Sequence, residues 1–339
     1  PPGPRGGGRA RPGAPPRERE SMLTVLNLVA RRFLTLIPLV LGITLFVFVI
    51  MQFSPIDPAL SVLGDQATPA QVEAFRAANG LNDPLPLRYL HFLGDLVRGD
   101  LGMTFPPSVP VAEKIALALP LTIQLTALGV VGALVIALAL GIPAALYRDR
   151  WPDQVIRIVS MAGIATPSFW LALLFIQEFS VRRPIFPTGG YVNPADSVGL
   201  WLQSLALPAL ALAVPVGCSL ARIVRTSMVE ELDKDYVRTA VGAGLPPRVV
   251  IGRNVLRNAL VNPLTALGLR IGYLIGGTVV IEAIFSLPGM GTQIMSAVQQ
   301  NDTALAQGTV LTIALGFVVV NLVVDILYLF ANPRLRGGH

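Results

Sequence analysis

Six long apolar stretches limit what this sequence can fold into. A hydrocarbon core of about 30 Å requires about 20 apolar residues per helix, and segments of that length recur along the chain. The stretches are 33–53, 115–146, 159–179, 200–223, 261–285 and 309–330. Only 14% of the residues are charged, against roughly a quarter in an average soluble domain. We therefore expect an all-α polytopic membrane protein with six transmembrane helices.

Basic residues in the loops predict the orientation of these helices. Arg31 and Arg32 precede the first stretch, and the segment 224–258 is the most basic loop of the chain. Lys and Arg are enriched in cytoplasmic loops, so both termini should be cytoplasmic. Arg182 and Arg183 fall on the outer side and break this rule. The net charge of +6 could suggest nucleic acid binding, but short basic loops beside apolar stretches are typical of membrane topology, and we expect no nucleic acid partner.

The chain divides into three parts. Residues 1–21 form a basic arm rich in Pro, Gly and Arg, which we expect to be disordered, and Met22 is a plausible alternative start. Residues 22–114 hold the first transmembrane helix and a large extracytoplasmic loop with short amphipathic helices. Residues 115–339 hold the other five spans, the cytoplasmic loop 224–258 and an outer loop 286–306.

Few side chains are suited to catalysis or to binding a metal. Cys218 is the only cysteine and lies in an apolar stretch, and His91 and His339 are the only histidines. A disulfide or a thiolate metal site cannot be built from one cysteine, and little histidine is left for acid-base chemistry. We expect no catalytic residue and no metal site.

The cytoplasmic loop contains a pattern typical of a docking helix. Residues 230–243 have acidic residues at their start, Gly244 is suited to a left-handed C-cap, and a second, basic helix should follow Pro246 and Pro247. The small residues around Ala240 and Gly244 leave a surface with little side-chain bulk, which could fit closely into a groove of another protein. An ordinary solvated loop helix fits the same pattern.

The segment Asp-Tyr-Val-Arg-Thr-Ala-Val-Gly-Ala-Gly-Leu at 235–245 resembles a known motif. It is similar to the cytoplasmic loop of ATP-binding-cassette (ABC) importer permeases, specifically the B-type permeases of dipeptide, oligopeptide and nickel systems. That family has Glu-Ala-Ala-x-x-x-Gly here, with Gly244 as the motif glycine. The resemblance implies a coupling helix that contacts the ATPase through Asp235, Tyr236, Arg238, Thr239, Ala240, Gly244 and Leu245, of which Arg238, Thr239 and Ala240 stand at the Glu-Ala-Ala positions.

The resemblance extends through nearly everything after Arg32. Further similar segments are 54–58, where Ile56 replaces the family's glycine, 98–102, 207–210, 285–291, 321–325 and 332–336. It implies a type I ABC importer permease fold in the bacterial inner membrane. It also implies these partners: a second homologous permease, two ABC ATPase subunits or one fused ATPase, and an extracytoplasmic substrate-binding protein.

The lysines exclude one kind of nucleotide site. A phosphate-binding loop requires Gly-x-x-x-x-Gly-Lys-Ser/Thr, and the only lysines, Lys114 and Lys234, lie in unrelated contexts. The chain should therefore carry no cofactor, with ATP and Mg bound by the partner ATPase subunits. The implied function is the pore-forming permease of an importer for di- or oligopeptides, working by alternating access.

Other functions remain open at this stage. Relatives of the same family carry nickel or haem-like ligands. An ion-coupled secondary transporter would need inverted repeats, and a membrane-embedded enzyme would need a cluster of catalytic residues; we find neither pattern convincingly.

Charged residues within spans are candidates for the translocation path, because burying them in lipid is costly. Arg270 in the fifth stretch could attract a peptide carboxylate. Glu282, near the outer end of the same stretch, could meet a peptide amine or hold an outer gate. For Asp325 a helix-packing role is equally open, and Glu178 is a weaker candidate.

Overall fold

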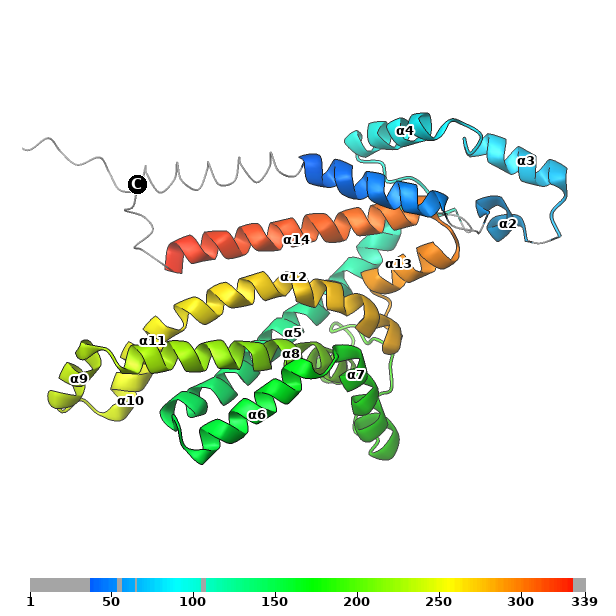
Figure 1. Ribbon diagram of the computed structural model, residues 1–339. Coiled ribbons are helices and arrows are strands. Elements are labelled where there is room, and N and C mark those ends of the chain that lie inside the picture. Colours follow the sequence, from blue (N-terminus) through cyan, green and yellow to red (C-terminus); the bar gives the residue numbers. More distant parts are fainter. Residues whose placement is uncertain (1–36, 54–56, 65, 105–107, 332–339) are drawn as a thin grey trace, which may run out of the picture.

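The computed structural model describes residues 37–53, 57–64, 66–104 and 108–331 (Figure 1). Within these ranges all regular elements are helices, and β-type pairing is limited to an isolated bridge between Met103 and Pro110. The helices are Ile37–Gln52, α2 Pro58–Leu63, α3 Pro69–Ala78, α4 Leu85–Val97, α5 Val111–Leu146, α6 Trp151–Ala165, α7 Ser168–Ile176, η1 Gln177–Arg182, α8 Val198–Leu232, α9 Asp235–Gly242, α10 Pro247–Val249, η2 Val250–Val255, α11 Leu256–Ala259, α12 Val261–Ile284, α13 Met290–Gln299 and α14 Thr303–Ala331.

Four described helices are long and apolar enough to cross a membrane: α5, α8, α12 and α14. A fifth crossing results if α6 together with α7 and η1 is one span, although its halves meet at a bend of 98°. The apolar helix Ile37–Gln52 is shorter, and the predicted first span begins outside the described residues. The predicted all-α, multi-span architecture is confirmed, but an unbroken set of six spans is not.

The bend in the third predicted span lies at Pro167. Thr166 has extended backbone angles (φ −85°, ψ 122°), because a residue before proline is disfavoured in the helical region. α6 therefore ends at Ala165 and α7 starts in a new direction, away from the other helices in Figure 1. The sequence predicts a break at this position, because Pro167 lies within the stretch 159–179, and the break is confirmed.

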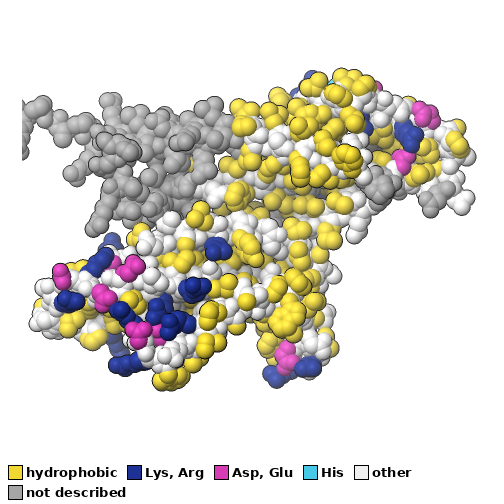
Figure 2. All heavy atoms as spheres, in the orientation of Figure 1, with side chains coloured by type: hydrophobic (Ala, Val, Ile, Leu, Met, Phe, Trp, Pro, Cys, Tyr) yellow, Lys and Arg dark blue, Asp and Glu magenta, His cyan; other side chains and the backbone are white. Residues whose placement is uncertain are grey.

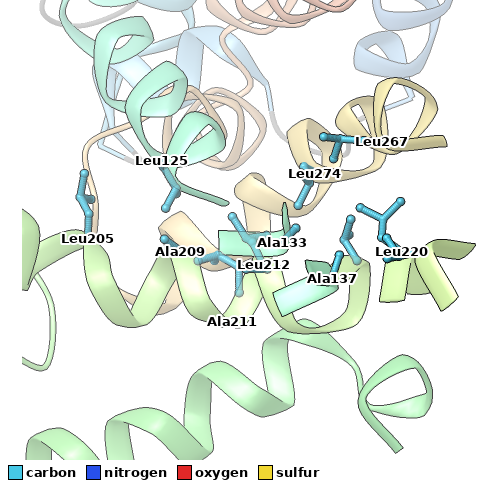
Figure 3. Packing of buried hydrophobic residues seen from close by; sticks show 14 of the residues in the cluster. Leu125, Ala133, Ala137, Leu205, Ala209, Ala211, Leu212, Leu220, Leu267 and Leu274 are labelled. Carbon is cyan, nitrogen blue, oxygen red and sulfur yellow. The ribbon is translucent and has the colours of Figure 1, made fainter. Parts of the chain in front are cut away.

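α8 is the central helix of the bundle. In its most apolar window 78% of the residues are buried, against 28% for α5 and for α12. Figure 3 shows side chains of α5, α8 and α12 meeting in one apolar cluster, with Leu212 of α8 among them. Pro208 and Pro215 lie inside this helix and are both buried, as the sequence predicts for a helix in the bundle interior.

Small residues allow α5 and α8 to pack at close range. A Cβ on Gly141 of α5 would lie 2.8 Å from the carbonyl oxygen of Ala221, and a Cβ on Gly217 of α8 would lie 2.9 Å from that of Ala133. Neither gap holds a methyl group, and small residues at helix interfaces are how membrane helices approach closely. The pair is thereby fixed in register over most of its length.

Two expected loops contain additional helical structure. The expected helix 230–243 is wrong, because α8 continues to Leu232 and α9 begins separately at Asp235. The outer loop 286–306 contains α13 and the start of α14. The short helices α2, α3 and α4 lie at the opposite end of the molecule from α9 and α10 (Figure 1).

α4 is held against the helix Ile37–Gln52. The Tyr89 hydroxyl lies 3.0 Å from the Thr44 hydroxyl and 3.0 Å from the Leu41 carbonyl oxygen. The rings of Tyr89 and Phe48 are 5.5 Å apart. These contacts attach the polar outer segment to an apolar helix.

Candidate functional site

α9 projects from the end of α8 and protrudes from one end of the molecule (Figure 1). Only Asp233 and Lys234 separate it from α8. Val237 is its buried residue and belongs to the same apolar cluster as Val250 and Val255 of η2. One side of α9 therefore packs against η2 through Val237, and the other side faces outward.

The end of α9 has the hydrogen-bond pattern of a Schellman motif. The Leu245 N–H donates to the Ala240 carbonyl at 3.2 Å, and the Gly244 N–H donates to the Val241 carbonyl at 3.0 Å. Gly244 has a φ of +78°, which L residues with a side chain rarely adopt. The left-handed cap predicted at Gly244 is confirmed.

The outward surface of α9 has little side-chain bulk at its C-terminal end. Gly242, Ala243 and Gly244 are exposed, and a Cβ added to Gly242 or Gly244 would meet nothing within 4 Å. Asp235, Arg238 and Thr239 are also exposed on this helix, and Leu245 follows it exposed. The structure thus brings most of the predicted coupling residues onto one protrusion.

Ala240 differs from its neighbours. It is half-buried and packs against the apolar cluster, because it follows Val237 by three residues on the inward side of the helix. Sequence reasoning places Ala240 on the exposed surface, and the structure places it at the seat of the helix.

A polar network ties the start of α9 to α8. The Tyr236 hydroxyl donates to Glu231 Oε1 at 2.8 Å, Lys234 pairs with Glu231 Oε2, and Asn258 Nδ2 donates to the Tyr236 hydroxyl at 3.4 Å. Burial, and after it the Glu231 carboxylate, raise the pKa of the Tyr236 phenol against the opposing effect of Asn258. Tyr236 therefore acts as a neutral donor that anchors the helix.

A second ion pair stiffens α8 behind this network. The fully buried Asp153, in the first turn of α6, accepts two hydrogen bonds from Arg225 of α8, each of 2.6 Å. The Asp149 N–H donates to the same carboxylate at 3.0 Å, and Asp149 has a φ of 60°. A two-point Arg–carboxylate contact fixes both distance and orientation, so the turn between α5 and α6 is locked to α8.

The comparison with family models decides which family this is. The model for the binding-protein-dependent transport system inner membrane component matches residues 137–337, a stretch that includes α6, α8 and α9. The N-terminal model of the same membrane component matches residues 25–126. The chain belongs to this family of transport permeases. It is a multi-pass inner-membrane permease subunit, and the family name implies that it works with a substrate-binding protein.

Curated relatives match the permease over nearly its whole length. A putative peptide transport system permease protein of Brucella abortus (strain 2308) is 41% identical over 309 residues, covering 91% of this chain and 98% of the relative. The glutathione transport system permease protein of Escherichia coli (strain K12) is 38% identical over 312 residues, covering 92% and 99%.

A solved structure shares the fold. An inward-facing structure of the MetNI methionine ABC transporter matches with a TM-score of 0.52 at 17% identity, covering 65% of this chain and 96% of that chain. This likeness confirms the predicted ABC permease architecture.

The two predicted path residues have different surroundings. Arg270 is exposed midway along α12, on a face that the described part of the chain leaves uncovered. Glu282 is fully buried; its Oε1 accepts a 2.6 Å bond from the Thr122 hydroxyl and its Oε2 a 2.6 Å bond from the Gly291 N–H. The two roles expected for Glu282, contact with a peptide amine and closure of an outer gate, both stay predictions.

The weaker candidates lie elsewhere. Glu178 is paired with both Arg182 and Arg183, at 3.3 and 3.2 Å, so these outer arginines are partly neutralised locally. Figure 2 shows this group at the tip of the segment that follows α7. The side chain of Asp325 lies outside the described residues. Among the residues that the structure describes, no group of three or more His, Cys, Asp or Glu could hold a metal.

Sequence reasoning missed the groups that stiffen the permease. In the sequence, Asp153 resembles any acidic residue in the first turn of a helix. Thr122 resembles any single polar residue within a span. A signal for the α5–α8 contact was present, since Gly129, Ala133, Ala137 and Gly141 recur every four residues and are all buried on α5.

Proposed function

We propose that this permease forms half of the pore of an ATP-driven ABC importer for peptides, and that α9 is the helix through which ATPase movement reaches the spans. α9 is the observation that carries the proposal. It is a capped, small-residue protrusion with one side seated on the chain, and it is anchored to the central helix by Glu231, Tyr236 and Lys234.

The geometry suits the transmission of force. A protrusion that is well packed on one side and free of bulk on the other can enter a groove closely and still move as part of its own chain. Because α8 is buried along most of its length and locked to α6, movement of α9 would carry the bundle with it. Two such arrangements of the bundle would open the path alternately to each side.

Relatives support a peptide as the substrate. The relative from Brucella abortus is named for peptide transport, and glutathione, the substrate in the name of the Escherichia coli relative, is itself a small peptide. We infer di- or oligopeptides for this chain, delivered by an extracytoplasmic binding protein.

The proposed assembly contains a second homologous permease and two ATPase subunits, separate or fused. The ATPases bind ATP and Mg, and α9 faces them in the cytoplasm with both termini on that side. Figure 2 shows basic side chains gathered at the end of the molecule that holds α9 and α10. They support this orientation, because Lys and Arg are enriched in cytoplasmic loops.

Gly242 offers the sharpest test of the α9 assignment. A Cβ at this exposed position meets nothing within 4 Å in the described part of the chain, so a larger side chain can extend outward and Gly242→Trp should fold normally. It should block docking of the ATPase and abolish ATP-dependent peptide uptake by the reconstituted complex. Gly242→Ala, the matched control, adds one methyl group in open space and should retain coupled transport.

The readouts are ATPase recovery with the purified permease pair, ATP hydrolysis stimulated by the binding protein, and peptide uptake. Wild-type values in Gly242→Trp for all of them would contradict the assignment of α9.

A further inference from the structure

Two charged side chains of α8, Arg222 and Glu230, line a pocket. The pocket, about 410 Å³ in volume, lies where the cytoplasmic half of α8 meets the start of α12. Its lining is mostly polar and comprises Ser219, Arg222, Ile223, Thr226, Ser227, Glu230 and Asn262. Arg222 also lines a second pocket, between α8 and α6, so its side chain stands on the open surface that the three helices share.

Arg222 and Glu230 contrast with the charged residues next to them. Arg225 is bound at two points by Asp153, and Glu231 is bound by Lys234 and Tyr236. Among the residues that the structure describes, no side-chain hydrogen bond or ion pair is found for Arg222 or Glu230. Both are exposed on the same helix whose remaining surface is largely buried. Within three turns of α8, Arg225 and Glu231 are therefore ion-paired within the fold, whereas Arg222 and Glu230 line the pocket.

A lipid-facing role does not suit this surface. Charged side chains in a membrane face a bundle interior or a water-filled cavity because hydrocarbon cannot solvate them. Arg270 of α12 is also exposed. Figure 2 shows basic side chains on the surface that α12, α8 and α6 form on the side in view. Basic groups from three helices on one face indicate an aqueous path or a second subunit in front of it.

We propose that this pocket is a peptide-binding station on the translocation path, in which Arg222 binds the peptide carboxylate and Glu230 binds its amino group. The assignment rests on the proposed peptide importer function and adds two specific residues and an orientation to it. A guanidinium binds a carboxylate through two parallel hydrogen bonds, and Glu230 offers acceptors to an ammonium group.

The spacing of the two residues selects short peptides. Eight residues along a helix separate Arg222 from Glu230 by about 12 Å along the axis. An extended tripeptide spans about 10 Å. A peptide of about three residues therefore reaches both charges with its carboxyl end toward the membrane interior, and Ser219, Thr226 and Asn262 lie between or beside them as hydrogen-bonding groups.

The first experiment measures uptake of a free tripeptide by the complete complex with its binding protein. Arg222→Gln and Glu230→Gln should each lower uptake about ten- to a hundredfold, the loss expected for one hydrogen bond to a charged group. Arg222→Lys should restore part of it, because it keeps the charge and loses the two-point geometry. Neither glutamine variant should lower the melting temperature, since neither side chain has a hydrogen-bond or ion-pair partner in the described part of the chain.

A second experiment tests whether the pocket is aqueous and occupied. Thr226→Cys should react with a membrane-impermeant, anionic thiosulfonate reagent, detected as a mass shift of this chain, whereas the buried Cys218 should not. Adding Arg222→Gln should slow the anionic reagent and leave a cationic one unslowed, and the tripeptide should protect the cysteine. Absence of labelling would place the pocket against lipid and overturn the proposal.

Anionic lipid is the competing ligand for Arg222. Uptake is therefore measured in vesicles of phosphatidylcholine alone and in vesicles with added phosphatidylglycerol. A defect of Arg222→Gln that is equal in both supports a peptide site, and a defect seen only with the anionic lipid overturns it. If the wild-type complex imports no peptide, the proposed function itself fails; if it does and Arg222→Gln imports equally well, only this inference fails.

Discussion

The guanidinium of Arg225 holds the carboxylate of Asp153 at two points, with Nε 2.6 Å from Oδ1 and Nη2 2.6 Å from Oδ2. Asp153 is fully buried, and Arg225 is 20% exposed. Without Arg225 the buried carboxylate keeps only the longer contact to Arg157 Nε, at 3.8 Å. Breaking a buried pair costs about 3–5 kcal/mol, so Arg225→Gln should lower the free energy of unfolding by up to about that amount. Thermal unfolding of the purified protein measures this. Arg222→Gln, three residues away on the same helix, should have little effect, and equal losses in both variants would argue against the pair.

Thr122 should matter for stability because it bonds in two directions. Its hydroxyl donates to Glu282 Oε1 at 2.6 Å and accepts from the Met290 N–H at 2.9 Å. Thr122→Val keeps the shape, removes the hydrogen-bond partner of the Met290 N–H and leaves the Glu282 carboxylate with one bond fewer. A buried polar group that loses its partner costs about 1–3 kcal/mol. Thr122→Ser keeps the hydroxyl and should remain near wild type. Unfolding temperatures that do not separate the two variants would contradict this account.

Gly291 should not tolerate even alanine. A Cβ there would lie 2.4 Å from the Cα of Val279 and 2.9 Å from Glu282 Oε2, so the backbone must shift. Overpacking of this kind costs about 1–3 kcal/mol, and Gly291→Ala should lower the yield of folded protein and its unfolding temperature. Gly94→Ala in α4, where a Cβ meets nothing within 4 Å, is the control and should be neutral or slightly stabilising.

The sequence predicted the spans better than the contacts that lock them together. Apolar length and loop charge depend on residues that are adjacent in the chain, and so α5, α12 and most of α8 were correctly anticipated. Thr122 and Glu282 are 160 residues apart, and their contact depends on how α5, α12 and the loop before α13 pack. The pattern of residues in α5 or α12 alone therefore does not predict that Thr122 and Glu282 are in contact.

Local chemistry also decided which details of the candidate site could be predicted. The cap at Gly244 follows from the residue itself, because only glycine adopts a φ of +78° without strain. The burial of Ala240 could not be predicted in this way, because it depends on where η2 lies. Similarly, Pro167 predicts that the third span is interrupted. The size of the bend between α6 and α7, 98°, depends on how the two helices pack and could not be predicted from that residue.

Gly244→Ala tests the cap of α9. An L residue in the left-handed region costs about 1–2 kcal/mol, so the end of α9 should fray and coupled uptake should fall. Gly244→Asn should be milder, because asparagine tolerates this conformation. The checks are hydrogen exchange at the Gly244 and Leu245 amides and peptide uptake by the complex. Unchanged exchange at both amides in Gly244→Ala would refute the role of the cap.

The raised pKa of Tyr236 predicts that the free energy of unfolding falls at alkaline pH. Its pKa is raised in the folded protein, chiefly by burial, so the folded state holds its proton more strongly than the unfolded state does. The contribution of Tyr236 is fully present below about pH 10, the unfolded value, and is lost as the pH rises through the folded value. Tyr236→Phe, which also loses the bond to Glu231, should be less stable at neutral pH and show a shallower alkaline decline. Parallel stability–pH curves for the two proteins would contradict this.

The uninterrupted length of α8 gives the molecule a mechanical advantage. A helix of 35 residues is about 52 Å long, so a tilt of about 10° around one end displaces the other by about 9 Å. The helix continues through Pro208 and Pro215, so its two ends belong to one element. A small rotation imposed beside α9 would therefore arrive at the outer surface as a displacement wide enough to admit or exclude an extended peptide chain.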